Sequence, residues 1–166
     1  NLVTKIYFPR EILPMASIGA AFLDYAIAFV LFVILMLAYQ IPLRATLLLL
    51  PLLLVIQIIL TLGISLIASA VIVFYRDVRF VVPLALQLWM YLSPVIYPVS
   101  SVPENWQALY MLNPMATLID SYRRITLLGE TPQWNYLAIT TCIAVVLFVL
   151  GYRYFRGAEA TFADII

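Results

Sequence analysis

The ionisable side chains of this sequence gather in a few places where they could do chemistry. Asp120 precedes Arg123 and Arg124 by three and four residues, the spacing at which side chains meet on one face of a helix. This group could simply neutralise itself, hold a local helical hairpin in shape, or meet an anionic substrate. Asp24 lies inside a long apolar run, where an acid either bonds to a neighbouring helix or lines a transport path. Together, Asp24 and Asp120 could also act as the acid and base of an enzyme.

Composition identifies the class of protein that carries these groups. Of the 166 residues, 66% are apolar and 10% are charged, and the mean hydropathy is +1.09, whereas about a quarter of the residues of soluble domains are charged. The net charge of +1 gives no indication of a nucleic-acid partner. Histidine is absent and Cys142 is the single cysteine, which excludes His-based catalysis and an intrachain disulfide. We therefore expect an all-α integral membrane protein.

Four stretches are apolar enough to cross the membrane as helices: 15–40, 46–74, 81–100 and 136–155. Prolines 83, 94 and 98 interrupt the third stretch, so we expect its far end to leave the helix. Residues 101–134 are amphipathic and are broken by further prolines. We expect them to form a re-entrant hairpin of two short helices, joined at Asn113 and Pro114, that dips into the membrane and returns.

The positions of Lys and Arg predict the orientation. Four crossings put the N-terminal segment, residues 75–79 and the C-terminal tail on one side, with six basic residues against three on the other. We expect the first side, with the C-terminus, to be cytoplasmic. The stretch "YRDVR" at 75–79 is then a very short cytoplasmic loop. Arg76 and Arg79 suit a positive-inside anchor, but Asp77 adds nothing to an anchor, and all three charges suit a loop that docks on a partner protein.

Aromatic side chains crowd the segment that this topology places outside. Trp and Tyr prefer the headgroup level in any membrane protein, so a belt at the interface explains part of this enrichment. Their flat faces and polar tips also suit stacking on sugar rings. The residues concerned are Trp89, Tyr91, Tyr97, Trp106, Tyr110, Tyr122 and Trp134.

No G-x-x-x-x-G-K-[ST] phosphate-binding loop occurs, and the five glycines are too scattered to form one. If ATP powers any transport here, another chain must hydrolyse it. We therefore expect no catalytic residue, metal or cofactor in this chain.

Four ordered motifs resemble the permease subunit of ABC-2 type polysaccharide exporters, the group that handles O-antigen, lipopolysaccharide, capsule and teichoic acid chains. They are "NLVTKIYFPREILP", "VFYRDVRFVVPLALQLWMYLSPVIYP", "VPENWQALYMLNPM" and the terminal "TFADII". The resemblance covers essentially residues 1–166, as one domain, and fits the C-terminal part of such a permease. It implies that an interface helix and two spans precede this sequence. It also implies a bacterial inner-membrane protein that acts as a homodimer with two ATPase chains, which bind the ATP and Mg.

The same resemblance assigns roles to particular residues. Residues 1–14 would be a cytoplasmic coupling segment on the ATPase, and 101–134 an outward re-entrant gate. The residues assigned to ATPase coupling are Thr4, Lys5, Tyr7, Phe8, Arg10, Glu11, Tyr75, Arg76, Asp77 and Arg79. The residues assigned to the channel for lipid-linked polysaccharide are Trp89, Tyr91, Tyr97, Trp106, Tyr110 and Tyr122. Asp24, Asp120, Arg123 and Arg124 are the remaining polar groups expected within the membrane.

Three other functions compete with polysaccharide export. A drug or lipid exporter of the same family would share the fold but not the aromatic, proline-broken exit. An intramembrane aspartyl protease would resemble others in a Gly-x-Gly-Asp context, whereas "TLI" precedes Asp120 here. A passive membrane anchor would use its charged loops for insertion alone, so that replacing Asp77 by Asn would change nothing.

Overall fold

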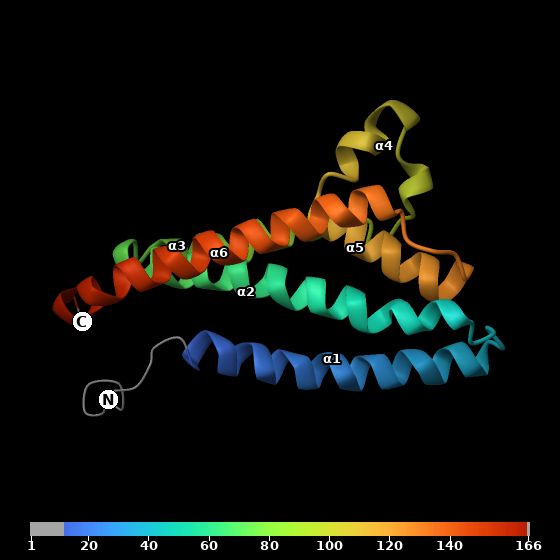
Figure 1. The fold of residues 1–166 in the computed structure, drawn as a ribbon, viewed down its shortest axis with the longest axis horizontal. Coiled ribbons are helices and arrows are strands. Elements are labelled where there is room, and N and C mark those ends of the chain that lie inside the picture. The colour runs from blue at the N-terminus through green and yellow to red at the C-terminus, as the bar shows by residue number, and fades with distance from the viewer. Residues whose placement is uncertain (1–11, 166) are drawn as a thin grey trace.

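The computed structural model describes the backbone of residues 12–165 and the side chains of residues 19–157. All regular structure in this part is helical (Figure 1). The long helices are α1 (Ile12–Ala38), α2 (Leu50–Phe74) and α6 (Trp134–Ile165), and α3 (Val78–Tyr91) is shorter. The short elements are η1 (Ala45–Leu49), η2 (Val99–Ser101), α4 (Glu104–Tyr110), α5 (Pro114–Arg123) and the π-helical turn η3 (Arg124–Leu128).

Three helical segments of the described chain are long and apolar enough to cross a membrane: Gly19–Ala38, Ala45–Phe74 and Trp134–Gly157. The third apolar stretch of the sequence forms α3, whose 14 residues span about 21 Å at 1.5 Å per residue, against the roughly 30 Å of a bilayer core. The predicted exit from the helix is confirmed, because α3 ends at Tyr91 and residues 92–98 are irregular. The predicted pair of short helices is also confirmed: α4 and α5 are joined at Asn113 and Pro114.

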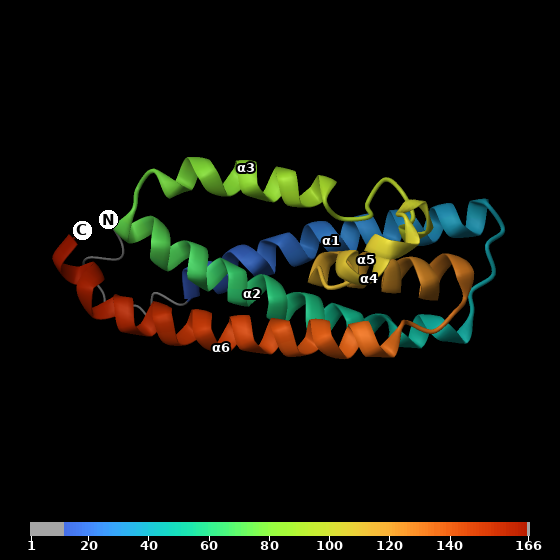
Figure 2. The ribbon, with the colours of Figure 1, turned by 90° about the horizontal axis from the view of Figure 1, so that it is seen from above.

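The helices run alternately between two ends of the molecule (Figures 1 and 2). The turn between α2 and α3 lies at the same end as the C-terminal end of α6 and the start of α1. The turn between α1 and α2 lies at the opposite end, together with α4 and α5. We call these the turn end and the hairpin end. This alternation is the arrangement that four passes of the chain require.

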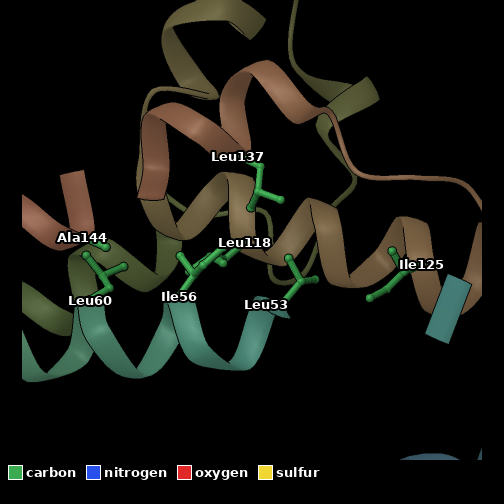
Figure 3. Close-up of a cluster of buried hydrophobic side chains, with 7 residues drawn as sticks. All are labelled: Leu53, Ile56, Leu60, Leu118, Ile125, Leu137 and Ala144. Carbon is green, nitrogen blue, oxygen red and sulfur yellow. The ribbon is translucent and has the colours of Figure 1, made fainter. Parts of the chain in front are cut away.

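The core joins α2, α5 and α6 near the hairpin end. Leu53, Ile56 and Leu60 project from α2 and meet side chains from the other two helices (Figure 3). Those partners are Leu118 and Ile125, from α5 and η3, and Leu137 and Ala144, from α6. Because lipid tails are as apolar as leucine, close packing rather than removal from water must hold such helices together in a membrane.

Two glycines let α2 and α6 touch along their backbones. A Cβ atom placed on Gly63 would lie 2.6 Å from the backbone nitrogen of Phe148, and one on Gly151 would lie 2.7 Å from the carbonyl oxygen of Gly63. Real Cβ atoms essentially never approach that closely. Each glycine therefore faces the backbone of the opposite helix, and neither position has room for a side chain.

We expect Gly63→Ala to lower the free energy of unfolding of the protein by about 1–3 kcal/mol, because the added methyl group must push α2 and α6 apart. Gly157→Ala is the matched control on α6: a Cβ there meets nothing within 4 Å, so the better helix propensity of alanine should leave stability unchanged or slightly raised. A denaturant titration in detergent measures both. Equal stability of Gly63→Ala and the parent would show that the crossing is not close-packed.

Candidate functional site

The hairpin end is organised around the side chain of Asn113. Its Oδ1 accepts a hydrogen bond from the backbone N–H of Met115 (3.1 Å) and so caps α5, which begins at a proline. The same oxygen accepts a second bond from Nε1 of Trp89 on α3 (2.9 Å). The Asn113 amide nitrogen donates to the carbonyl of Leu92 and the hydroxyl of Ser93, both at 3.3 Å. One side chain thus fixes the end of α3 to the start of α5.

Arg123 holds the irregular segment that follows α3. Its guanidinium donates to the carbonyl oxygens of Pro94 (3.1 Å), Val95 (3.5 Å) and Tyr97 (3.1 Å). A chain that leaves its helix at membrane depth exposes carbonyls that lipid cannot satisfy, and each unsatisfied group costs several kcal/mol. The five N–H donors of one arginine suit this task. Arg123 therefore binds the backbone of residues 94–97, and among the described residues it forms no ion pair with Asp120.

Asp120 instead pairs with Arg124. The Nε atom of Arg124 lies 3.1 Å from Oδ2 of Asp120, one helical turn away. The Nη1 atom of Arg124 lies 2.8 Å from Oε2 of Glu130, in the linker to α6. Asp120 is buried, so the pair places a compensated charge inside the hairpin end. Of the two arginines in the predicted cluster, only Arg124 neutralises the acid.

Three of the predicted channel aromatics lie together at the hairpin end. The hydroxyl groups of Tyr97 and Tyr110 are 2.7 Å apart, and their ring centroids are 6.4 Å apart. Burial first, and then the hydrogen bond to Tyr97, raise the pKa of Tyr110 above its ordinary value, so this phenol stays neutral at physiological pH. Trp106 is 60% exposed and shares a shallow cavity of about 260 Å³ with Tyr110, Leu92 and Leu109. An open indole beside a neutral phenol forms an amphipathic surface.

The other three channel aromatics have different surroundings. Trp89 lines an apolar groove of about 460 Å³ between α2 and α3, and its indole N–H is used by Asn113. The hydroxyl group of Tyr122 donates to Oε1 of Gln57 on α2 (2.8 Å), so Tyr122 joins two helices. Tyr91 is exposed, and its backbone carbonyl accepts a bond from the hydroxyl of Tyr97 (3.2 Å). The six residues therefore do not form one continuous lining within a single copy of the chain.

The turn end presents the charges predicted to dock on a partner. Arg76, Asp77 and Arg79 are exposed, and a bond from the N–H of Val78 to the carbonyl of Tyr75 (3.0 Å) closes the turn. The guanidinium of Arg79 lies over the ring of Phe80, at 4.6 Å. Among the described residues no ion pair involves Asp77. Three charges of mixed sign thus lie exposed at the short turn between α2 and α3. The six coupling residues predicted between positions 4 and 11 lie outside the described part of the chain.

Asp24 lies on an exposed face of α1. On the same helix, the rings of Phe22, Tyr25 and Phe29 stack one after another, with centroids 6.4 and 6.2 Å apart. Asp120 is on α5 and is bonded to Arg124. The structure therefore gives no support to a catalytic pair made from Asp24 and Asp120.

Sequence reasoning missed the part that Asn113 plays. The pair Asn113 and Pro114 carries the signal of a helix start, an asparagine cap followed by proline at the first helical position, and that signal could have identified the cap. Nothing in the local sequence indicates that the same amide also reaches Trp89, 24 residues earlier.

Comparison with known proteins places the chain among transporters. The model of the family described as ABC-2 type transporter matches residues 1–127. The O-antigen export system permease protein RfbA of Klebsiella pneumoniae is 28% identical over 100% of this chain and 64% of its own length. The RfbA protein of Myxococcus xanthus is 29% identical over 100% of this chain and 65% of its own length. The polysialic acid transport protein KpsM of Escherichia coli is 27% identical over 58% of this chain and 38% of its own length. The chain thus spans a little under two thirds of the length of the first two relatives.

We expect Asn113→Ala to lower the free energy of unfolding of the protein by about 1–3 kcal/mol, since it removes a helix cap and leaves the Trp89 indole N–H unpaired. Asn113→Asp keeps the oxygen that caps α5 and accepts from Trp89, so it should cost less. Hydrogen exchange of the peptide spanning residues 89–98 should rise in the alanine variant. Unchanged exchange and stability in Asn113→Ala would contradict a fastening role for this side chain.

Proposed function

The chain belongs to the ABC-2 type transporter family, and from this premise we propose that it is the membrane-spanning part of an exporter of lipid-linked polysaccharide. The observation that carries the proposal is the alignment of the entire chain with two permeases named for O-antigen export, at 28% and 29% identity. In the proposed transporter, a separate ATPase binds ATP and Mg, and the polymer crosses the bacterial inner membrane between two copies of the permease. The turn end, with the C-terminus, faces the cytoplasm.

The turn between α2 and α3 is the proposed point at which the ATPase acts. Its exposed mixed charges can dock on a protein surface. Because α3 begins directly after the turn, a push on the turn moves α3 as a rod of about 21 Å. At the far end of that rod, Asn113 and Arg123 fasten the chain to α5. These contacts support the transmission of a rigid-body motion from the turn end to the hairpin end.

The aromatic surface at the hairpin end supports a sugar as the transported unit. A pyranose has an apolar C–H face and a polar rim, which match the open ring of Trp106 and the neutral phenol of Tyr110. A stacked ring is held without being enclosed. A long polymer needs such weak and repeated contacts, because each unit must leave as the next one enters.

A second candidate substrate is a lipid or an apolar drug. The groove of about 460 Å³ between α2 and α3 favours it, since most of its lining is aliphatic, with Leu60, Ile64 and Leu86 among the residues. The two candidates predict different effects of substitution. An apolar substrate should depend on the groove and be indifferent to Trp106, whereas a polysaccharide should show the reverse.

Charge reversal in the turn tests the coupling. We expect Asp77→Lys, or Arg76→Glu, in the full-length permease to reduce polymer export by about ten-fold or more while membrane insertion stays normal, because each places like charges across the docking surface. Arg153→Ala removes an exposed charge from the C-terminal end of α6, outside the turn, and serves as the control. Cell-surface polymer and ATPase co-purification are measured together. Full export by Asp77→Lys would reject the docking role.

Aromatic truncation tests the sugar contact. We expect Trp106→Ala to slow polymer export roughly two- to ten-fold, the range set by the 0.5–1.5 kcal/mol of an aromatic contact. Tyr110→Phe keeps the ring but loses the bond to Tyr97, so it should slow export less than Tyr110→Ala. Trp134→Ala is the control, because Trp134 is 51% exposed but lies at the start of α6, apart from the cavity of Trp106. If Trp106→Ala and Trp134→Ala export equally well, the surface does not guide the substrate.

A further inference from the structure

A polar cavity of about 590 Å³ lies at the hairpin end, beside the aromatic surface but separate from it. One wall is the stretch 98–104 with Gln107, from η2 and α4. The other wall carries Asp120, Arg123 and Arg124, with Gln133 from the linker to α6. We call it the hairpin cavity. Its volume falls within the roughly 300–1,000 Å³ that is usual for small-ligand sites.

The basic groups of the hairpin cavity are already committed. Arg123 donates to three backbone carbonyls of residues 94–97. Arg124 donates to Asp120 from Nε and to Glu130 from Nη1. The lining also holds two acids, Glu104 and Asp120, against these two arginines, so its formal charge is balanced. The balanced lining therefore offers no net positive charge that would favour a phosphate or a carboxylate over an uncharged occupant.

Hydrogen-bond acceptors and hydroxyls, by contrast, remain open in the hairpin cavity. Asp120 uses Oδ2 for Arg124, and within the described part of the chain its Oδ1 has no hydrogen-bond partner. Glu104 presents a second exposed carboxylate from the first turn of α4. Ser100 and Ser101 add hydroxyl groups, which both donate and accept. Two carboxylates beside hydroxyl groups suit a ligand that donates hydrogen bonds from several O–H groups. Hydrogen bonds from an O–H group to a carboxylate are stronger than those between two neutral groups.

We propose that the hairpin cavity binds an uncharged sugar unit, with Asp120 as the residue that selects hydroxyl donors through its free oxygen. The choice of a sugar among hydroxyl-rich solutes rests on the proposed function. The hairpin cavity is then a second binding site for the sugar, alongside Trp106 and Tyr110. It recognises the hydroxyl groups at the rim of the sugar ring, whereas the aromatic surface contacts the face of the ring. Stacking tolerates most sugars, whereas a buried carboxylate discriminates by the arrangement of hydroxyls.

Saturation-transfer NMR on the full-length permease with its ATPase, in nanodiscs, tests this assignment. The probes are the methyl glycosides of glucose, galactose, mannose and N-acetylglucosamine, with methyl glucuronide as the acidic counterpart of the first. We expect at least one uncharged glycoside to bind, and methyl glucuronide to bind more weakly than methyl glucoside. Asp120→Asn should weaken binding by about ten-fold or more, because it removes a charged acceptor. Glu130→Gln is the matched control: it alters the other partner of Arg124 but lies outside the cavity lining.

A second variant keeps the proposal falsifiable if Asp120→Asn fails to fold. Ser101→Trp fills the cavity from an exposed position without touching the bond between Asp120 and Arg124, and it should also abolish binding. Binding of none of the four uncharged glycosides overturns the proposal, as does equal weakening by Glu130→Gln and Asp120→Asn. A signal lost in Trp106→Ala but retained in both cavity variants places binding on the aromatic surface and overturns it as well. If the parent exports polymer in cells yet fails these tests, this inference falls and the transporter assignment stands.

Discussion

The contact on which the rest of the structure depends is the crossing of α2 and α6 at two glycines. Gly63 and Gly151 each face the backbone of the opposite helix, so the two helices lie closer than any side chain permits. In a membrane, where lipid competes equally well for apolar side chains, such backbone proximity is a main source of helix association. Leu53, Ile56 and Leu60 then extend the contact to α5. The paired helices form the fixed frame against which the hairpin end is built.

Polar side chains bind the backbone groups that are left without helical partners where the prolines end α3. Once α3 ends at Tyr91, residues 92–98 cannot satisfy their own backbone as a helix would. Asn113 supplies donors to Leu92 and Ser93, and Arg123 supplies donors to the carbonyls that follow. Both come from the hairpin that the same exit leads into. The irregular segment and α5 therefore stabilise one another, and each is expected to lose its shape without the other.

Sequence reasoning reached the features that depend on local composition. Apolar length predicted the long helices, and Pro94 and Pro98 predicted the loss of helix after Tyr91. Spacing could not tell which arginine pairs with Asp120, because Arg123 and Arg124 both lie one helical turn from it. Only the fold shows that Arg124 pairs with the acid and that Arg123 faces the carbonyls of residues 94–97. Gly63 belongs to a run of small residues in the sequence, a pattern that indicates close helix packing. No local pattern identifies Gly151 as its partner, since the pairing is set by how α2 and α6 cross. Contacts between residues far apart in the sequence depend on how the helices pack, and no local sequence pattern predicts them.

The packing of α3 differs from that of α2 and α6 in a way that bears on mechanism. α3 packs only lightly on α2, stands apart from the other helices in Figure 2, and has no buried residue. One face of α3 lines the apolar groove, and the helix is held chiefly at its two ends, by the turn of residues 75–77 and by Asn113 and Arg123. A helix fixed along its length could not move without breaking the core. A helix fixed at its ends can shift as a unit while α2 and α6 stay in place, and this division between a fixed frame and a moving helix suits the proposed permease, which a separate ATPase would drive.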